Sequence, residues 1–273
     1  MKKIWHYVGV IFIMFWGLAP FYWMLITALR DSAHTFDTTP WPTHVTLQNF
    51  YDALATNKGN DFLGAIGNSL IISLSTTAIA VAVGVFTAYA IARLDFPGKG
   101  IVTGVILAAS MFPGIALITP LFQLFGDLGW IGTYRAMIIP NISFALPLTI
   151  YTLISFFQQL PWELEQAARV DGATRGQAFR LVLLPLAAPA IFTTAILAFI
   201  TTWNEFMLAR QLSTTATEPV TVAIARFSGP SAFEYPYASI MAAGSLVTVP
   251  LIIMVLIFQR RIVSGLTAGG VKG

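Results

Sequence analysis

Six long stretches without a charged side chain constrain this sequence more than any other feature. None of them contains Asp, Glu, Lys or Arg, and each exceeds the ~20 residues that a helix needs to cross a hydrocarbon core of ~30 Å. Backbone amides in lipid must be hydrogen-bonded within the protein, and stretches of this length without strand alternation achieve that only as helices. The sequence therefore predicts a polytopic membrane protein of the all-α class.

The composition supports a lipid environment. Only 10% of the residues are charged, against roughly 25% in ordinary soluble domains, so the chain lacks the charges to cover a surface in water. We expect a single transmembrane domain over residues 1–273 with six helical spans. The predicted spans are residues 4–29, 62–92, 100–126, 136–160, 181–209 and 235–259; the fifth span extends past its charge-free stretch, residues 181–204, and so includes Glu205.

The basic residues predict the orientation. Six spans place both termini on one side, and a cytoplasmic N-terminus puts ten Lys and Arg residues inside and five outside. Because positively charged loops favour the cytoplasmic side, we predict that both termini are cytoplasmic, with the opposite orientation as the alternative. The basic residues lie at the ends of apolar runs rather than in one patch, so no nucleic-acid partner is expected.

Histidine and cysteine usage gives no sign of a metal site. The chain has no cysteine, and His6, His34 and His44 all lie in its first 44 residues without the spacing of metal ligands. We therefore predict no bound metal.

The longest predicted cytoplasmic loop, residues 161–180, carries the clearest functional pattern. It begins with a proline followed by Glu163 and Glu165, an arrangement that favours the start of a short helix. Gly172 permits a sharp change of direction before a second short helix. Two alanines with short side chains leave a face of the first helix that can fit into a cleft of a partner. The alternative is that the loop is an amphipathic linker lying on the membrane surface.

The spacing within this loop closely resembles the EAA loop of permeases from bacterial ABC importers. The family motif reads Glu-Ala-Ala, three residues, Gly, nine residues, a β-branched residue, one residue and Leu-Pro. The departure is Gln166, where the family usually has Glu, and Glu163 and Glu165 are expected to compensate for the missing charge. The matching residues are Gln166, Ala167, Ala168, Gly172, Val182, Leu184 and Pro185.

Other segments extend the resemblance over nearly the whole chain, to the carbohydrate-uptake subfamily of these permeases. The resemblance implies the type I importer permease fold. Within the subfamily, the chain is most similar to the second permease of actinobacterial trehalose importers. The segments that carry the resemblance are Asn68-Ser69, Ala88-Tyr89-Ala90, Arg93, Phe96-Pro97-Gly98, Met111-Phe112-Pro113, Thr119-Pro120-Leu121, Trp203-Asn204-Glu205 and residues 259–273.

The resemblance also implies a function. The chain is expected to be the permease subunit of an ATP-driven carbohydrate importer in a bacterial inner membrane and not itself an enzyme. Its implied partners are a second homologous permease, two ATPase subunits and an extracytoplasmic or lipid-anchored solute-binding protein. ATP and Mg are expected on the ATPases, and no cofactor on this chain. The implied substrate is a disaccharide such as trehalose, with a maltose-type oligosaccharide or glycerol phosphate as alternatives.

The motif match assigns residues to the contact with the ATPase. The resemblance implies that this loop transmits work rather than catalysing a reaction. The implied coupling residues are Glu163, Glu165, Gln166, Ala167, Ala168, Asp171, Gly172, Ala173 and Arg175.

Polar side chains within the spans are the candidates for contact with the sugar, because an uncharged sugar is recognised by amides, hydroxyls and aromatic faces. If the fifth helix continues past Asn204, Glu205 becomes the one carboxylate inside a span, which makes it a functional candidate. The alternative places Glu205 at the external boundary or pairs it with Arg210. Asn68 is expected to bond a neighbouring helix instead. The candidates are Asn141, Ser143, Trp203, Asn204 and Glu205.

An ion-coupled secondary transporter is the main rival function. Proton relays use several buried acids or histidines, and Glu205 is the one acid that the spans offer. The chain also has no Gly-x-x-x-x-Gly-Lys-Ser/Thr phosphate loop, so ATP hydrolysis by that route belongs to a separate subunit.

Overall fold

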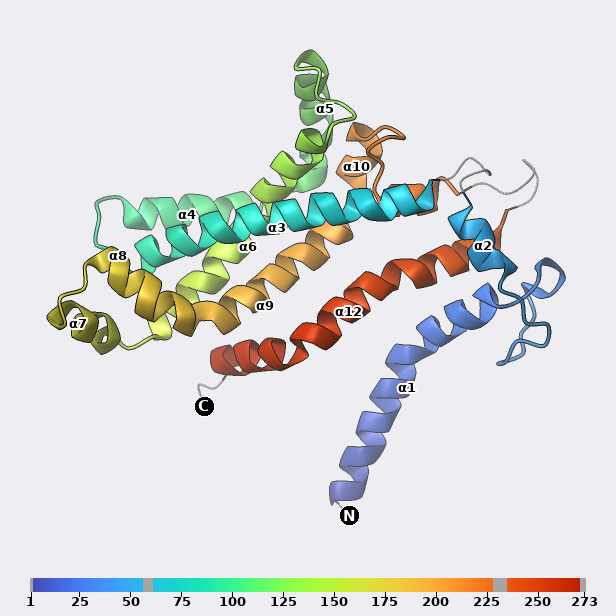
Figure 1. Cartoon of the computed structure of the whole chain (residues 1–273), viewed down its shortest axis with the longest axis horizontal. Coiled ribbons are helices and arrows are strands. Elements are labelled where there is room, and N and C mark those ends of the chain that lie inside the picture. The colour runs from blue at the N-terminus through green and yellow to red at the C-terminus, as the bar shows by residue number, and fades with distance from the viewer. Residues whose placement is uncertain (1, 56–60, 228–234, 271–273) are drawn as a thin grey trace. The chain divides into compact units, whose positions relative to one another are not determined.

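The computed structural model describes residues 2–55, 61–227 and 235–270. Within these ranges the regular elements are helices and helical turns, together with one isolated antiparallel bridge between Arg30 and Val45, so the all-α prediction is confirmed. The elements (Figure 1) are α1 (Lys2–Ala28), η1 (Ser32–His34), α2 (Gln48–Leu54), α3 (Phe62–Arg93), α4 (Lys99–Ser110), η3 (Gly114–Leu117), α5 (Ile118–Asp127), α6 (Tyr134–Gln159), α7 (Trp162–Val170), α8 (Arg175–Ala178), η4 (Phe179–Leu183), α9 (Leu184–Trp203), α10 (Met207–Leu212), α11 (Val220–Ala225) and α12 (Tyr237–Gly270).

Contacts divide the chain into two compact units. The first contains residues 1–67 and 219–252, and the second contains residues 68–218 and 253–273. Helices α3 and α12 contribute to both units. A single transmembrane domain over residues 1–273 stays a prediction.

Five helical segments of the described chain are long and apolar enough to cross a membrane. They match the first, second, fourth, fifth and sixth predicted spans, with boundaries that differ by a few residues. The segments are Ile4–Ala28, Phe62–Arg93, Tyr134–Gln159, Arg175–Trp203 and Tyr237–Gln259.

The third apolar stretch is bent, which the prediction of one span over residues 100–126 did not include. Helix α4 ends at Ser110, and the chain turns by 86° before η3 and α5. Pro113 lies at the bend; it has no N–H to donate, and it disfavours helical geometry in the residue before it. Because the 12 residues of α4 reach only about 18 Å, α4 and α5 together provide at most one broken span.

The fifth predicted span also differs at its end, since residues 181–209 do not form one helix. Helix α9 ends at Trp203, and Glu205 lies between α9 and α10. The two Glu205 carboxylate oxygens accept hydrogen bonds from the backbone N–H groups of Leu208 (2.7 Å) and Ala209 (3.0 Å). An acidic side chain that accepts hydrogen bonds from the first backbone N–H groups of a helix stabilises the start of that helix. Glu205 therefore favours a separate α10 over continuation of α9.

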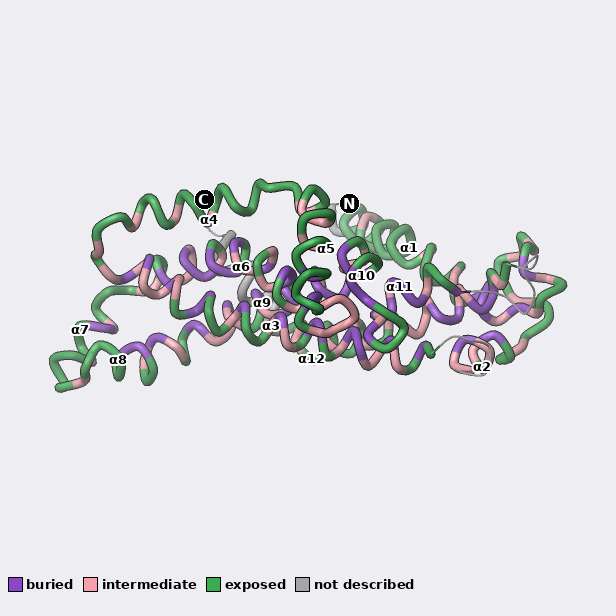
Figure 2. Tube along the Cα trace, turned by 90° about the horizontal axis from the view of Figure 1, so that it is seen from above, coloured by how far each residue is buried: buried purple, intermediate pink, exposed green. Residues whose placement is uncertain are grey.

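The core of the second unit lies where α3, α6, η4 and α9 meet. Helix α6 packs against both α4 and α9. Figure 2 shows buried positions along α6 and α9, whereas α4 has no buried residue. The core therefore continues from the spans into η4, which directly follows α8. Its buried members are Val85, Ala88, Ile91, Ile150, Leu153, Ile154, Phe157, Phe179, Leu183, Ala187 and Ala190.

Small residues on α3 allow α6 to approach closely. Ala80 and Ala88 are fully buried. A Cβ added at Gly84 would lie 2.5 Å from the Thr149 methyl carbon, closer than atoms pack. The Thr149 hydroxyl donates to the Ala145 carbonyl of its own helix at 2.8 Å, which fixes the methyl in place.

Substituting Gly84→Ala is therefore expected to destabilise the protein by about 1–3 kcal/mol through overpacking. The readout is the midpoint of thermal unfolding of the purified chain in detergent. Gly67→Ala is the matched control on the same helix, because no atom lies within 4 Å of the Cβ position at Gly67. Thr149→Ser removes the clashing methyl and keeps the hydroxyl, so the double variant should recover stability. Equal midpoints for the Gly84 and Gly67 variants would show that this contact does not limit packing.

In the first unit, α1 leaves most of its side chains exposed. Only 6% of its most apolar window is buried. An apolar surface of this extent is expected to meet lipid or another subunit. The C-terminal end of α1 is an exception, because Ile26 and Ala28 are buried.

Candidate functional site

The segment 161–180, called the elbow below, has the two-helix form that its sequence predicts. Helix α7 begins directly after Pro161, and α8 begins after Thr174, whose side chain forms a capping box with Gln177. Between the helices, Gly172 has a φ of +89°. That backbone conformation is readily reached only by glycine, so Gly172 sets the reversal between the two arms.

One acid of α7 faces the interior of the second unit. Glu165 is 5% exposed, and its Oε1 accepts a hydrogen bond of 3.2 Å from the Tyr89 hydroxyl of α3. Glu163 and Gln166 are exposed. The expectation that Glu165 replaces the missing surface charge at Gln166 is therefore wrong, because its carboxylate is turned toward α3 and leaves Glu163 as the exposed acid of that turn.

Arg93, at the end of α3, holds the start of α7. Arg93 is 5% exposed; its guanidinium donates to the Leu160 carbonyl at 2.5 Å and lies 4.6 Å from the ring centroid of Trp162. A cation over an aromatic face is attracted by the ring, more strongly where water is excluded. Tyr89 and Arg93 lie four residues apart and so share a face of α3.

The second arm of the elbow is held by the same face of α3. The Tyr89 ring lies 4.4 Å from that of Phe179, measured between centroids. Phe179 belongs to η4, and α8, η4 and α9 form one helical segment, Arg175–Trp203. Tyr89 therefore contacts both arms of the elbow.

The remaining coupling candidates form the outer surface of the elbow. Val170 is 86% exposed, so an apolar side chain lies open between the charged Arg169 and Asp171, where a partner can reach it. Ala168 and Ala173 are half-buried. The exposed members are Glu163, Gln166, Ala167, Arg169, Asp171, Gly172 and Arg175.

Sequence reasoning did not assign a role to Tyr89, Arg93 or Val170. Tyr89 and Arg93 lie in segments that carry the family resemblance, so a signal for them was present. Their role depends on contacts with residues 67 to 76 positions away, which no local pattern indicates. The sequence gives no signal for Val170, because a single valine in a short helix is equally consistent with a buried and with an exposed position.

The structure divides four of the five predicted sugar contacts between buried and exposed positions. Asn141 and Trp203 are buried inside the chain, the former donating to the Met137 carbonyl at 2.9 Å and the latter stacked on Phe199. Ser143 and Asn204 are exposed, and each bonds a carbonyl of its own helix.

Asn68 has the packing role that was predicted for it. Its side-chain nitrogen donates to the carbonyls of Ala216 (3.3 Å) and Glu218 (3.0 Å). Its oxygen accepts a hydrogen bond of 2.5 Å from the Tyr134 hydroxyl of α6. Asn68 thus ties the segment before α11 to α6.

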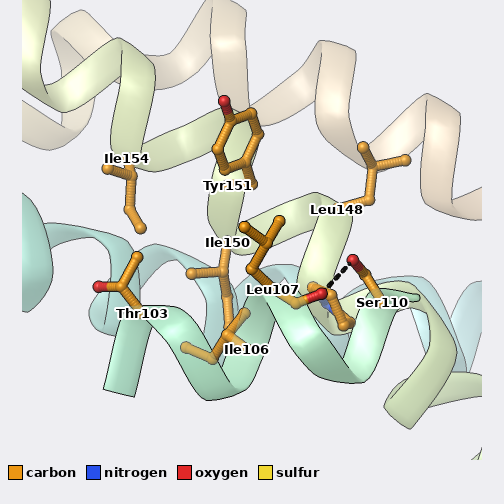
Figure 3. A pocket seen from close by; sticks show the side chains of 9 residues that line it. Thr103, Ile106, Leu107, Ser110, Leu148, Ile150, Tyr151 and Ile154 are labelled. Atoms are coloured by element: carbon orange, nitrogen blue, oxygen red, sulfur yellow. Dashed lines mark hydrogen bonds between the residues drawn. The ribbon is translucent and has the colours of Figure 1, made fainter. Parts of the chain in front are cut away.

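A cavity of about 210 Å³ lies between α4 and α6 (Figure 3). Its walls are largely apolar, and the Ser110 hydroxyl already donates to the Leu107 carbonyl at 2.6 Å. None of the five predicted sugar contacts lines it. The lining residues are Thr103, Ile106, Leu107, Ser110, Pro147, Leu148, Ile150, Tyr151 and Ile154.

Comparison with known proteins agrees with this architecture. Residues 80–267 match the family described as "Binding-protein-dependent transport system inner membrane component". The trehalose transport system permease protein SugB of Mycobacterium tuberculosis is 48% identical over 259 residues, covering 94% of this chain and 93% of that protein. The trehalose/maltose transport system permease protein MalG of Thermococcus litoralis is 39% identical over 274 residues, covering 100% and 98%.

Among solved structures, a bacterial ABC transporter involved in the import of the acidic polysaccharide alginate has the same fold. The TM-score is 0.78 at 20% identity, covering 95% of this chain and 96% of that one. The fold and the relatives define a multi-pass permease subunit of the ABC importer class, which transports rather than catalyses and depends on a binding protein. The chain belongs to the family of binding-protein-dependent transport system inner membrane components.

Proposed function

We propose that this chain forms half of the translocation pathway of an ATP-driven importer for trehalose. The observation that carries the substrate is its 48% identity, over 94% of its length, to a permease named for trehalose transport. Maltose is the second candidate substrate, because another relative is named for trehalose and maltose. A maltose-type oligosaccharide or glycerol phosphate stays as the wider alternative.

The proposed complex contains this chain, a second homologous permease, two ATPase subunits that carry ATP and Mg, and an external solute-binding protein. In this complex the elbow and both termini lie on the cytoplasmic side. This orientation places ten basic residues inside and five outside, as the preference of positive charge for the cytoplasmic side favours. The exposed face of the elbow is the surface offered to one ATPase. Exposed α1 is suited to contact with lipid or the second permease.

Coupling follows from how the elbow is held. Movement of an ATPase against Glu163, Val170 and Asp171 displaces α7 and α8. The contacts of Arg93 and Tyr89 transmit that displacement to α3, and the helical segment that begins at Arg175 transmits it to α9. Because both arms are attached to spans rather than to loose segments, the work reaches the pathway and is not lost in bending of the elbow.

The test is uptake by the complete complex in proteoliposomes with ATP on the ATPase side. Labelled trehalose should accumulate only with hydrolysable ATP, and dissipating ion gradients should leave the rate unchanged. Excess unlabelled trehalose should compete fully, and maltose and glycerol phosphate less well. Uptake of trehalose by this chain without an ATPase would contradict the importer proposal, while preferential competition by maltose would contradict trehalose as the substrate.

A further inference from the structure

The loop that follows α1 is held in place by its own side chains. Arg30 is 1% exposed and donates to the backbone carbonyls of Asp37 and Thr39. Asn49 donates to the carbonyls of Ala28 (2.9 Å) and Arg30 (2.6 Å). Groups carried on this loop therefore have fixed backbone positions.

The backbone pairing of this loop brings two distant residues together. Arg30 and Val45 form an antiparallel bridge, which places Asp31 next to His44 in the same register. Asp31 also caps η1: its Oδ1 accepts from the His34 backbone N–H at 3.0 Å and lies 2.6 Å from His34 Nδ1. The rings of His34 and His44 stack, with centroids 4.0 Å apart.

The side chains of Asp31, His34 and His44 make a ligand set for a metal ion. One ligand atom from each lies within 4.8 Å of the others. Two ligands of one tetrahedral zinc ion, each about 2.0–2.2 Å from it, lie about 3.3–3.6 Å apart, so binding has to draw the three ligand atoms closer together. His44 is exposed, so its ring has room to rotate out of the stack toward the other two ligands.

The Asp31–His34 pair already brings two of the three ligand atoms together. Asp31 Oδ1 and His34 Nδ1 lie 2.6 Å apart, so an ion that takes the place of the shared proton bonds both atoms after a small opening of the pair.

We propose that Asp31, His34 and His44 bind a divalent cation of the zinc class on the loop between α1 and α2. Imidazole and carboxylate are ligands that zinc accepts, and three protein ligands leave a fourth position for water. The proposal departs from the sequence prediction of no bound metal, because the bridge at Arg30 brings together positions 31 and 44, which lie far apart in the sequence. The proposal does not depend on the transported substrate.

The test is zinc binding by the full chain, purified with a histidine-free affinity tag, stripped with a chelator and placed in lipid nanodiscs. We expect about one tightly bound zinc per chain, measured by elemental analysis after dialysis, and cobalt absorption typical of a low-symmetry site. His34→Ala and His44→Ala should each weaken zinc binding by about tenfold or more. His6→Ala is the matched control and should bind as wild type, since His6 on α1 is the only other histidine and the chain has no cysteine.

Asp31→Asn separates binding from folding. Asparagine keeps the capping oxygen, so the metal-free variant should unfold at the wild-type temperature while zinc affinity falls by about tenfold or more. Equal zinc binding by wild type and the His34→Ala/His44→Ala double variant would overturn the proposal. Wild-type affinity in Asp31→Asn would also overturn the three-residue site.

Discussion

Replacing Arg93 with alanine is expected to lower ATP-driven uptake by about tenfold or more, while ATP hydrolysis by the assembled complex falls by less than about half. Arg93 bonds the Leu160 carbonyl and lies over the Trp162 ring. Loss of both contacts costs about 2–3 kcal/mol. Because about 1.4 kcal/mol corresponds to a tenfold change in an equilibrium constant, this loss shifts α7 toward its undocked position by more than tenfold. The ATPases would still turn over, but their movement would bend the elbow instead of moving α3.

The measurement is uptake and phosphate release by the same proteoliposomes. Arg210→Ala is the control, because Arg210 is an exposed arginine of α10 outside the elbow, and it should behave as wild type. Arg93→Lys keeps the charge but not the planar group that lies on the ring, so an intermediate uptake rate is expected. Wild-type uptake in Arg93→Ala would show that this contact does not transmit the work.

Replacing Val170 with lysine is expected to reduce the amount of ATPase that co-purifies with the permease by about tenfold, because a charge would enter an apolar contact. Val170 is 86% exposed and is the last residue of α7. A positive charge at the C-terminal end of a helix is favourable, so the elbow itself should remain folded. Uptake should fall in proportion to the lost ATPase.

Val170→Ile is the control and should keep both association and uptake, since it remains apolar. The unfolding temperature of the isolated Val170→Lys chain should match wild type, which separates loss of docking from loss of folding. Unchanged ATPase recovery in Val170→Lys would place the docking surface elsewhere.

The two substitutions test different steps of one mechanism. Val170 lies on the outer surface of the elbow, so its substitution should remove the ATPase and hydrolysis together. Arg93 lies beneath the elbow, so its substitution should leave the ATPase bound and active but poorly coupled. If both variants lose ATPase association alike, Arg93 acts by shaping the docking surface rather than by transmitting force.

Local chemistry made much of this protein predictable. Apolar stretches of 25 residues or more must be helical in lipid, because no water is present to bond their backbone groups. The elbow was equally predictable: a proline with acids at its start and Gly172 at its reversal determine two short helices within one segment. Its spacing also indicated the family that the comparisons show.

Tertiary contacts decided what local patterns leave open. Both Glu163 and Glu165 suit the first turn of a helix, and only the position of Tyr89 on another span turns Glu165 inward. The end of α9 at Trp203 depends on the hydrogen bonds that Glu205 makes to the next helix.

The 86° turn after α4 and the meeting of Asp31 with His44 likewise needed the folded chain. Hydropathy and capping act within a few residues of the sequence and so determine which segments are helical. The direction in which a side chain points is determined by which distant backbone lies against it, and that became known only once the helices were packed.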